Sequence, residues 1–507
     1  MQKSRTYNSI MNSCIGMISA IINIALNLAV RVVIVRFLGD EINGVHSLFQ
    51  SIMSILAVME TSLTTAMIIN LYRPIKDKDN DIVSKLMHIY HGLYSALAFA
   101  FFVISIVINM VMDVFMATED NKVIHIYFLI FSLSFIANYL TYSHRSILYG
   151  EQNNRFSVVA TTISELVFRG LGIILVVSSK EYWPFLVCLV FEKLFGNFIC
   201  RNKVLQNHKY LRNIKKTDVD KNLREKILFS AKPLFVNQLA ITVQNASPSI
   251  IIGIVLKNVS LIGYYGNYQL IVGAMSALFS QIGAAFTSSF GNLAAGNDKK
   301  HMQLVYKRVH FIITSVATIC SCGFAACVNE FIIFAFGYSH LLPYSTALLI
   351  TICMFANLSN VTIISIQNAT GTHKLDSKYM VLQAIITIVS CFIGGNMSGI
   401  NGIVIGLTLP TIIFTTIIKG LLVLNHCLEY SKENILKEII VVYIKALLVL
   451  SFVLCICKYI VLSNVLLRFI TKGVVSVVCA AVLIAVFSTN NDGYKYLIGI
   501  IKNRCRI

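Results

Sequence analysis

Apolar stretches of the length of a membrane-spanning helix follow one another along the whole chain. A helix that crosses the hydrocarbon core needs roughly 20 mostly apolar residues, and about fourteen stretches meet that length. Short polar segments separate them. The pattern predicts an all-α membrane protein. The predicted spans are 10–35, 44–69, 86–111, 123–148, 157–178, 184–200, 233–256, 264–289, 309–329, 344–367, 379–395, 402–424, 439–460 and 468–487.

Basic residues gather in every second segment between these spans. Lys and Arg favour the cytoplasmic ends of membrane helices, so the basic segments and both termini are predicted to be cytoplasmic. The same bias accounts for most of the net charge of +19, and no nucleic-acid partner is needed to explain it. The predicted location is therefore a membrane that the chain crosses many times, with the basic segments on its cytoplasmic side. The basic segments are 72–85, 149–155, 201–232, 291–308, 371–378 and 425–437.

The composition supports the membrane prediction. Hydrophobic residues make up 56% of the chain and charged residues only 13%. Soluble domains carry about 25% charged residues, so an ordinary soluble enzyme is excluded. Thirteen cysteines include no CxxC pair, and the histidines form no HExxH motif. We therefore predict no catalytic residue, no metal and no cofactor, with the cysteines acting as small buried hydrophobic residues.

Two halves of the chain resemble each other. The segment FLGDEINGVH at 37–46 enters the second span, and VLKNVSLIGYY at 255–265 enters the eighth, about 219 residues later with one insertion. Phe49 and Tyr268 follow at matching places. Transporters are often built from such repeats, with the substrate site between them. We predict two six-helix lobes in parallel repeat and two additional C-terminal helices.

The repeat also sets the predicted domain boundaries. The N-terminal lobe comprises 1–200, the C-terminal lobe comprises 233–424, and 425–507 holds the last two spans and a cytoplasmic tail. The segment 201–232 between the lobes is strongly basic. It is predicted to be either a basic helix on anionic lipid or a solvated connector.

A few charged residues lie inside the predicted spans. Charges in the bilayer interior are costly and usually face a partner or a watery cavity. Arg31 lies in span one, where Asn23 and Asn27 precede it at helical spacing, and Glu60 lies in span two. Arg31 is a candidate for a cationic cavity. Glu60 could either face that cavity or pair with Arg31.

Span five contains Glu165 and Arg169 at i and i+4. That order favours an ion pair within the helix. The pair therefore has two interpretations, mutual neutralisation or a role in substrate binding and ion coupling. Snorkelling explains Lys193 and Lys419 near helix ends. The remaining two lysines in apolar segments, Lys445 and Lys472, either snorkel or contact anionic headgroups.

Polar side chains concentrate in spans seven and eight. Gln244 and Asn245 precede Pro248, and Gln281 lies in the next span. Amides can bind sugar hydroxyls, but they also hold membrane helices together. Pro248 and Pro410 lie inside spans, where proline either kinks a helix or is simply tolerated. The three amide residues join the substrate-binding candidates.

These segments resemble a known family. FLGDEING at 37–44, with Leu48-Phe49 and Glu60 after it, is similar to the start of Wzx-type polysaccharide flippases. The stretch 262–268, followed by Gly291-Asn292-Leu293, is similar as well. This family belongs to the superfamily of the lipid II flippase and the MATE exporters, and the resemblance covers essentially the whole chain.

The resemblance implies two bundles around a hydrophilic, often cationic cavity. It implies transfer of an undecaprenyl-diphosphate-linked oligosaccharide between leaflets by alternating access, without bond making or breaking. Membrane lipids are the expected surroundings, and a polysaccharide polymerase and a chain-length regulator are expected partners. Related flippases often have an acidic residue near 247–249, where this chain has Pro248, so Glu60 becomes the likelier acidic residue. Arg31 and Arg169 are the expected phosphate contacts, because Arg binds phosphate in a bidentate manner.

Two other functions compete with this prediction. A MATE-like exporter of small cations would favour an acidic cavity, whereas Arg31 is basic. A membrane polymerase or ligase of the O-antigen type would carry a sizeable outer loop, and the predicted outer loops are short. The chain also contains no Walker A motif, so it does not hydrolyse ATP by that mechanism.

Overall fold

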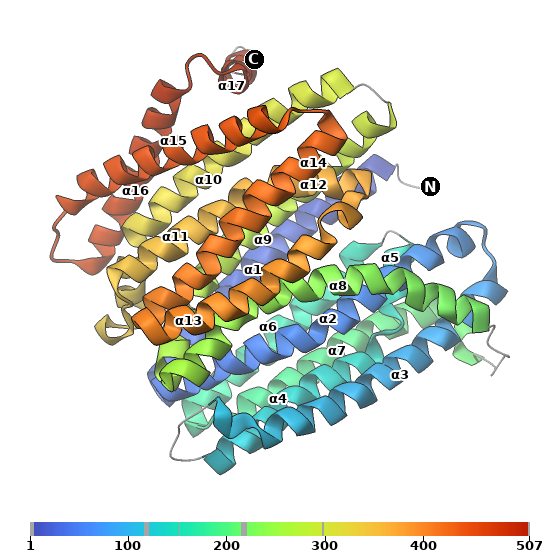
Figure 1. The fold of residues 1–507 in the computed structure, drawn as a ribbon. Helices are drawn as coiled ribbons and strands as arrows, with labels where there is room; N and C mark the ends of the chain where they lie inside the picture. The colour runs from blue at the N-terminus through green and yellow to red at the C-terminus, as the bar shows by residue number, and fades with distance from the viewer. Residues whose placement is uncertain (1–4, 116–120, 152, 214–220, 297–298, 505–507) are drawn as a thin grey trace. The chain divides into compact units, whose positions relative to one another are not determined.

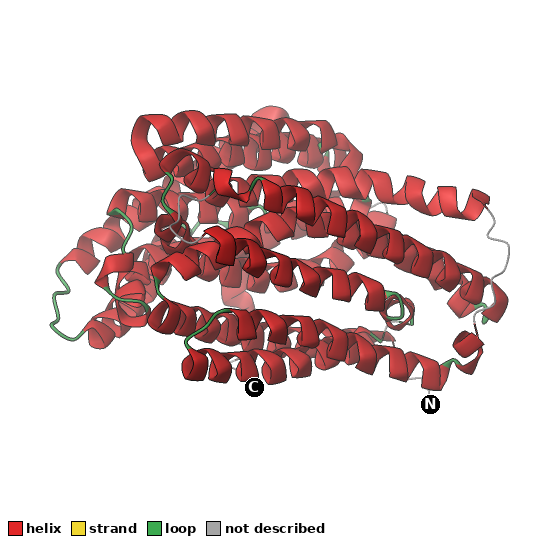
Figure 2. Ribbon diagram, turned by 90° about the horizontal axis from the view of Figure 1, so that it is seen from below, coloured by secondary structure: helices red, strands yellow, loops and turns green. Residues whose placement is uncertain are grey.

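The computed structural model describes residues 5–115, 121–151, 153–213, 221–296 and 299–504. Every secondary-structure element in these ranges is a helix (Figures 1 and 2). Packing contacts divide the chain into two compact units, Met1–Gly266 and Asn267–Ile507. The all-α prediction is confirmed.

The first unit consists of long helices joined by short turns. Helix α7 packs against α4 and α6, α1 packs against α6, and α2 packs against α8. The elements of this unit are α1 (Arg5–Leu38), α2 (Asp40–Lys76), α3 (Asn80–Met110), η1 (Met112–Val114), α4 (Asn121–Tyr142), α5 (Arg145–Gly150), α6 (Asn154–Ser179), α7 (Trp183–Asn207), η2 (Lys209–Asn213), α8 (Lys221–Ile251), η3 (Ile252–Leu256) and the first turns of α9 (Val259–Ala295).

The second unit is organised around α10, which packs against α11, α15, α16 and α17. After the remainder of α9 its elements are α10 (Lys299–Ala335), η4 (Tyr338–His340), α11 (Tyr344–Ser359), α12 (Val361–Thr370), η5 (Thr372–Leu375), α13 (Ser377–Pro410), η6 (Thr411–Ile418), α14 (Lys419–Leu428), α15 (Lys432–Lys458), α16 (Val465–Phe487) and α17 (Asp492–Arg504).

The described residues contain 13 helical segments that are long and apolar enough to cross a membrane. One of them, Ser377–Leu428, is 52 residues long and reverses direction at Ser398 and Gly399, where Gly399 has φ +60°. Its two arms touch, because a Cβ built on Gly394 would lie 2.3 Å from the carbonyl oxygen of Gly402. This segment therefore supplies two crossings, as the predicted spans 379–395 and 402–424 require.

Pro410 removes one backbone hydrogen bond from the second arm of this hairpin, and a side chain replaces it. Pro410 cannot donate to the carbonyl of Gly406, four residues earlier. The hydroxyl of Ser390 donates to that carbonyl instead, at 2.7 Å. A π-helical segment, η6, begins directly after Pro410, and a second one, η3, begins at Ile252, one helical turn after Pro248. Irregular helix thus follows closely after Pro248 and Pro410.

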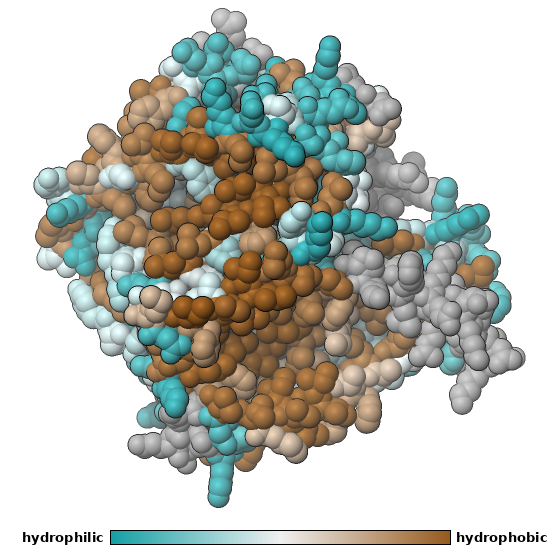
Figure 3. Space-filling model, viewed as in Figure 1, coloured by the Kyte–Doolittle hydropathy of each residue, from teal (hydrophilic) through white to brown (hydrophobic). Residues whose placement is uncertain are grey.

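Large apolar side chains are exposed along the outer helices. Ile440, Ile444 and Leu448 on α15 recur every four residues and are exposed, as are Val474 and Val478 on α16. Figure 3 shows apolar side chains over the middle of the visible face and hydrophilic ones mainly toward helix ends. An apolar surface of this extent indicates contact with lipid.

Several predicted boundaries differ from the observed ones. The fourth span was expected to reach residue 148, but α4 ends at Tyr142 and a short helix, α5, begins at Arg145. The predicted linker 201–232 is partly helical, since α7 runs to Asn207 and α8 begins at Lys221, while 214–220 lie outside the described residues. The compact units divide at Gly266, because α8 packs against α2. The six-plus-six division by repeat stays a prediction.

Candidate functional site

The first unit contains a network of buried charges centred on Arg169 of α6. Its Nε donates to Glu192 of α7 at 2.8 Å, and its Nη2 donates to both Glu192 (3.2 Å) and Glu165 (3.3 Å). Its Nη1 donates to Asn27 (2.7 Å) and Asn23 (3.3 Å) of α1. The guanidinium therefore connects three helices.

These contacts satisfy Arg169 completely. A guanidinium has five N–H donors, and the five hydrogen bonds use each of them. Lys193 donates to Glu192 at 2.8 Å, and Asn23 donates to Glu165 at 2.5 Å. Two cations and two carboxylates then balance. An anion that binds Arg169 would have to displace one of these partners.

Arg31 lies in a different environment. Its side chain is buried, and its Nη1 donates to Asn43 at 3.0 Å and to Ser47 at 2.5 Å, both on α2. Its Nη2 donates to Gln50, one turn farther along α2, at 3.4 Å. These three partners are neutral side chains, and together they hold the guanidinium in position.

The two repeated sequence segments meet beside Arg31. A Cβ on Gly44 would lie 1.9 Å from the carbonyl oxygen of Val259, and one on Gly266 would lie 2.8 Å from Nη1 of Arg31. The hydroxyl of Tyr264 donates to Asp40 at 2.7 Å. The beginning of α9 therefore packs closely on the beginning of α2 and on the buried guanidinium.

Glu60 has a separate set of partners. Its carboxylate accepts a hydrogen bond from Asn138 of α4 at 3.1 Å. Asn197 of α7 donates to the side chain of Asn138 at 3.1 Å and to Thr141 at 2.7 Å. Glu60 and Arg31 thus use different partners on different helices, and the structure does not pair them.

The remaining predicted site residues divide by exposure. Gln244 is buried in α8, next to the exposed Asn245. Gln281 is exposed on α9 in the second unit. Ser247 lies in the same polar patch as Gln244. Its hydroxyl donates to the backbone carbonyl of Val243 at 2.5 Å, a hydrogen bond within α8 itself.

Three lysines that were expected to snorkel or to contact lipid instead form ion pairs. Lys193 pairs with Glu192, and the buried Lys419 pairs with Asp376 at 3.2 Å. Lys472 of α16 pairs with Glu330 of α10 at 2.5 Å, and Arg468 lies 3.6 Å from the same carboxylate. The partner of Lys193 is its neighbour in sequence on α7. The predictions for Lys419 and Lys472 were wrong, because their acidic partners come from a turn and a helix that pack alongside.

Sequence reasoning missed some members of these networks. Glu192 is 2% exposed and is the main partner of Arg169, although it is 23 residues away. Asn138 and Asn197 connect Glu60 to α4 and α7. An acidic or amide residue in an apolar span was the available signal in each case.

A hydrogen bond joins two further polar residues of the first unit. Tyr182 lies between α6 and α7, and its hydroxyl lies 2.7 Å from Nδ1 of His46 on α2. Burial raises the pKa of Tyr182, so the phenol keeps its proton and can donate. Among the described residues no group of three His, Cys, Asp or Glu side chains has the arrangement of a metal site.

The fold, with its 13 long apolar helical segments among the described residues, is that of a multi-pass membrane protein. The chain belongs to the polysaccharide biosynthesis protein family, whose model matches residues 9–290, more than half of its length. No curated protein sequence matches the chain.

Solved structures share the fold. A structure of the lipid II flippase MurJ in an inward closed conformation superposes with a TM-score of 0.70 at 14% identity, covering 95% of this chain and 99% of that one. An inward-facing MATE-family multidrug resistance transporter gives a TM-score of 0.59 at 14% identity, with 80% and 96% covered. The MATE transporter VcmN of Vibrio cholerae gives 0.58 at 13% identity, with 81% and 94% covered.

Proposed function

We propose that this protein flips undecaprenyl-diphosphate-linked oligosaccharide repeat units across the bacterial cytoplasmic membrane for the synthesis of a surface polysaccharide, such as O-antigen, capsule or exopolysaccharide. The observation that carries the proposal is a buried arginine, Arg31, inside the membrane fold of a polysaccharide biosynthesis protein. Likeness to the lipid II flippase supports a lipid-linked substrate.

The physical task explains why a protein is required. A diphosphate with several sugars cannot cross hydrocarbon unaided, because an unpaired charge there is prohibitively costly. A guanidinium matches phosphate oxygens with two parallel hydrogen bonds. Arg31 is the proposed phosphate contact, since neutral residues of α2 already hold its side chain in place.

The other site residues have supporting roles in the proposal. Arg169 can approach the anion only by exchanging a partner, so its network orients α1, α6 and α7 around the pathway. Amide side chains suit sugar hydroxyls. The proposed sugar contacts are Asn23, Asn27, Gln244, Asn245 and Gln281.

Alternating access accounts for the repeat and the helix irregularities. Gly44 allows α2 to pack tightly on the start of α9, a contact that must separate when that end opens. The π-helical segments after Pro248 and Pro410 are places where a helix can bend. Glu60 and Glu165 are the proposed ion-coupling residues, because both are carboxylates held by amide donors.

The proposed function also implies the topology and the partners of the protein. No bond is made or broken, so the protein is not an enzyme and needs no cofactor. Both termini face the cytoplasm, where the basic segments lie. A polysaccharide polymerase and a chain-length regulator would receive the flipped units on the opposite side of the membrane.

Gene deletion tests this function directly. Loss of the protein should leave lipid-linked repeat units on the cytoplasmic face, where a membrane-impermeant glycosidase cannot reach them in intact spheroplasts. Plasmid-borne wild-type protein should restore their accessibility. Unchanged accessibility in the deletion strain would overturn the proposal.

A MATE-like small-molecule exporter is the second candidate, because MATE transporters share the fold. The deletion strain distinguishes the two functions. The exporter function predicts higher accumulation of cationic dyes after deletion with normal glycolipid, whereas the flippase function predicts the reverse.

A further inference from the structure

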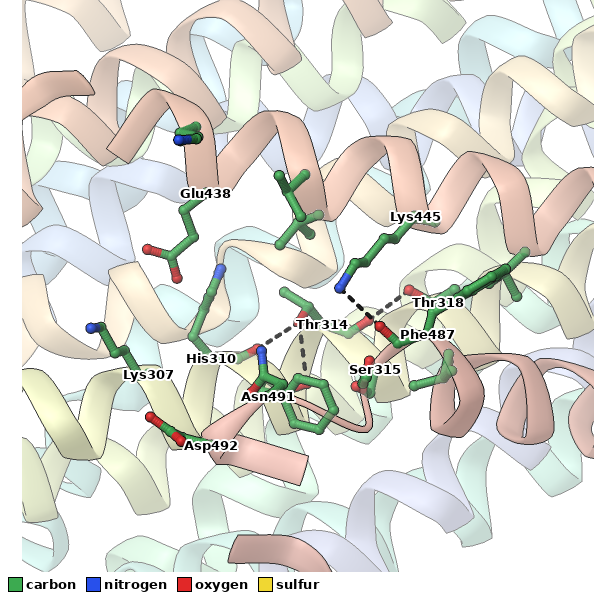
Figure 4. Close-up of a pocket in the computed structure, with 18 of the residues that line it drawn as sticks. Lys307, His310, Thr314, Ser315, Thr318, Glu438, Lys445, Phe487, Asn491 and Asp492 are labelled. Carbon is green, nitrogen blue, oxygen red and sulfur yellow. Dashed lines mark hydrogen bonds between the residues drawn. The ribbon is translucent and has the colours of Figure 1, made fainter. Parts of the chain in front are cut away.

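A pocket of about 430 Å³ lies in the second unit where α10 and α15 begin and α16 ends (Figure 4). Three lysines line it, Lys307 from α10 and Lys437 and Lys445 from α15. Two carboxylates, Glu438 and Asp492, line it as well. With three positive and two negative side chains the lining has an excess of one positive charge.

A hydrogen bond between two helices lies at the pocket. Lys445 donates to the carbonyl oxygen of Phe487 at 3.2 Å, in the last turn of α16 (Figure 4). Helix C-termini leave carbonyls without helical partners, and a cation there is stabilised by the helix dipole. Since an ammonium has three donors, this contact anchors Lys445 at the pocket and leaves it able to bind a ligand.

A buried polar group supplies a second, independent observation. His310 of α10 lines the pocket and is 8% exposed, and its Nδ1 has no hydrogen-bond partner among the described residues. In Figure 4 its imidazole reaches from α10 toward the side on which Glu438 lies. A buried nitrogen without a partner is energetically costly, so it points to a ligand that supplies one.

The pocket changes from polar to apolar along its length. Val449, Ile484 and Phe487 line it together with the lysines. On the outer surface of α15, Ile444 and Leu448 are exposed. An amphipathic molecule matches this gradient, with its charged group near the helix ends and its chain along α15 and α16.

We propose that this pocket binds the headgroup of an anionic glycerophospholipid such as phosphatidylglycerol. The single negative charge of a phosphodiester neutralises the excess positive charge of the lining. A zwitterionic headgroup would leave that charge unbalanced, and a diphosphate would face repulsion from Glu438 and Asp492. The headgroup comes from the leaflet at the end where the basic segments 291–308 and 425–437 lie.

Binding of phosphatidylglycerol to the full-length protein in neutral detergent tests the site, with native mass spectrometry as the readout. The double substitution Lys437→Gln/Lys445→Gln should weaken binding about tenfold or more, because two charge-assisted contacts are lost. The matched control is Lys432→Gln/Lys495→Gln, which removes two exposed lysines from α15 and α17 outside the pocket. Equal losses in both doubles, or no loss in either, would overturn the proposal.

Two further variants guard against a folding defect. Lys445→Arg keeps the charge and the contact with Phe487, so it should retain binding. Lys437→Glu changes an exposed side chain and reverses its charge, so it should abolish binding while the unfolding temperature in detergent stays unchanged. Retained binding in Lys437→Glu contradicts the proposal.

Competition identifies the source of the phosphate. Phosphatidylethanolamine and diacylglycerol should not displace phosphatidylglycerol at equal concentration, and undecaprenyl phosphate should displace it no better than phosphatidylglycerol itself. Preferential displacement by undecaprenyl phosphate would assign the pocket to the polyprenyl substrate instead and overturn the proposal. None of these measurements depends on transport, so they are independent of the proposed function.

Discussion

The backbones of Gly44 and Gly263, two positions that the predicted sequence repeat aligns, lie against each other. A Cβ on Gly263 would be 2.9 Å from the backbone nitrogen of Gly44 and 2.6 Å from the side-chain nitrogen Nδ2 of Asn43. The two positions are 219 residues apart, the offset of the sequence repeat. The contact thus joins two positions that the predicted repeat relates to each other.

Substitution of Gly44 by alanine should prevent this contact. The new methyl group would lie 1.9 Å from the carbonyl oxygen of Val259, which backbone cannot accommodate without moving. We expect a lower unfolding temperature in detergent and a large loss of polysaccharide export. Gly92→Ala on α3 is the control, since nothing lies within 4 Å of its Cβ position. Similar effects of both substitutions would contradict the close packing of α2 on α9.

Export should require the forked shape of the Arg31 guanidinium as well as its positive charge. Arg31→Lys keeps the positive charge but loses the forked geometry that contacts Asn43, Ser47 and Gln50. We expect export to fall about 10- to 100-fold in Arg31→Lys and further in Arg31→Ala, by the loss of one charge-assisted bidentate contact. Surface polysaccharide and membrane protein levels measure the effect. Arg36→Ala, an exposed residue in the last turn of α1, should behave as wild type, and normal export in Arg31→Ala would remove Arg31 from the mechanism.

The Arg169 network should show strong coupling between its members. Arg169→Gln leaves Glu165 and Glu192 with one cation, and removal of one partner from a buried ion pair costs about 3–5 kcal/mol. Adding Glu165→Gln restores the charge balance, because Lys193 still pairs with Glu192. The double variant should recover more than half of the lost unfolding temperature.

An exposed ion pair provides the comparison for that experiment. The side chain of Arg73 is 92% exposed and lies 3.6 Å from Asp77. Surface pairs contribute little, so Arg73→Gln should leave the unfolding temperature nearly unchanged. A double variant no more stable than Arg169→Gln would indicate that the network is held by packing and not by charge.

Glu60 should affect coupling more than folding. Glu60→Gln keeps an oxygen that can accept from Asn138, so the protein should fold, but it removes the ionisable group. We expect flipping in liposomes to lose its response to an imposed pH gradient. Glu41→Gln, an exposed residue near the start of α2, is the control. A gradient response that persists in Glu60→Gln would exclude the coupling role.

Much of the fold was predictable because it depends on local properties of the sequence. The length of each apolar stretch predicts one membrane crossing, and the distribution of basic residues between the two sides predicts the orientation. Neither prediction depends on which helices pack together. Even the hairpin in Ser377–Leu428 was predicted, from the polar break at 396–401. The order of Glu165 and Arg169 likewise predicted their ion pair, which the structure contains.

The partners of the buried charges were decided by tertiary structure alone. Glu192 reaches Arg169 from another helix, Asp376 reaches Lys419 from a turn, and Glu330 reaches Lys472 across 142 positions. Hydropathy places a residue at a depth along its helix but does not say which helix lies beside it or how that helix is rotated. Since the cost of a buried charge depends on the atoms within a few ångströms of it, only the packed bundle determines which partners each buried charge meets.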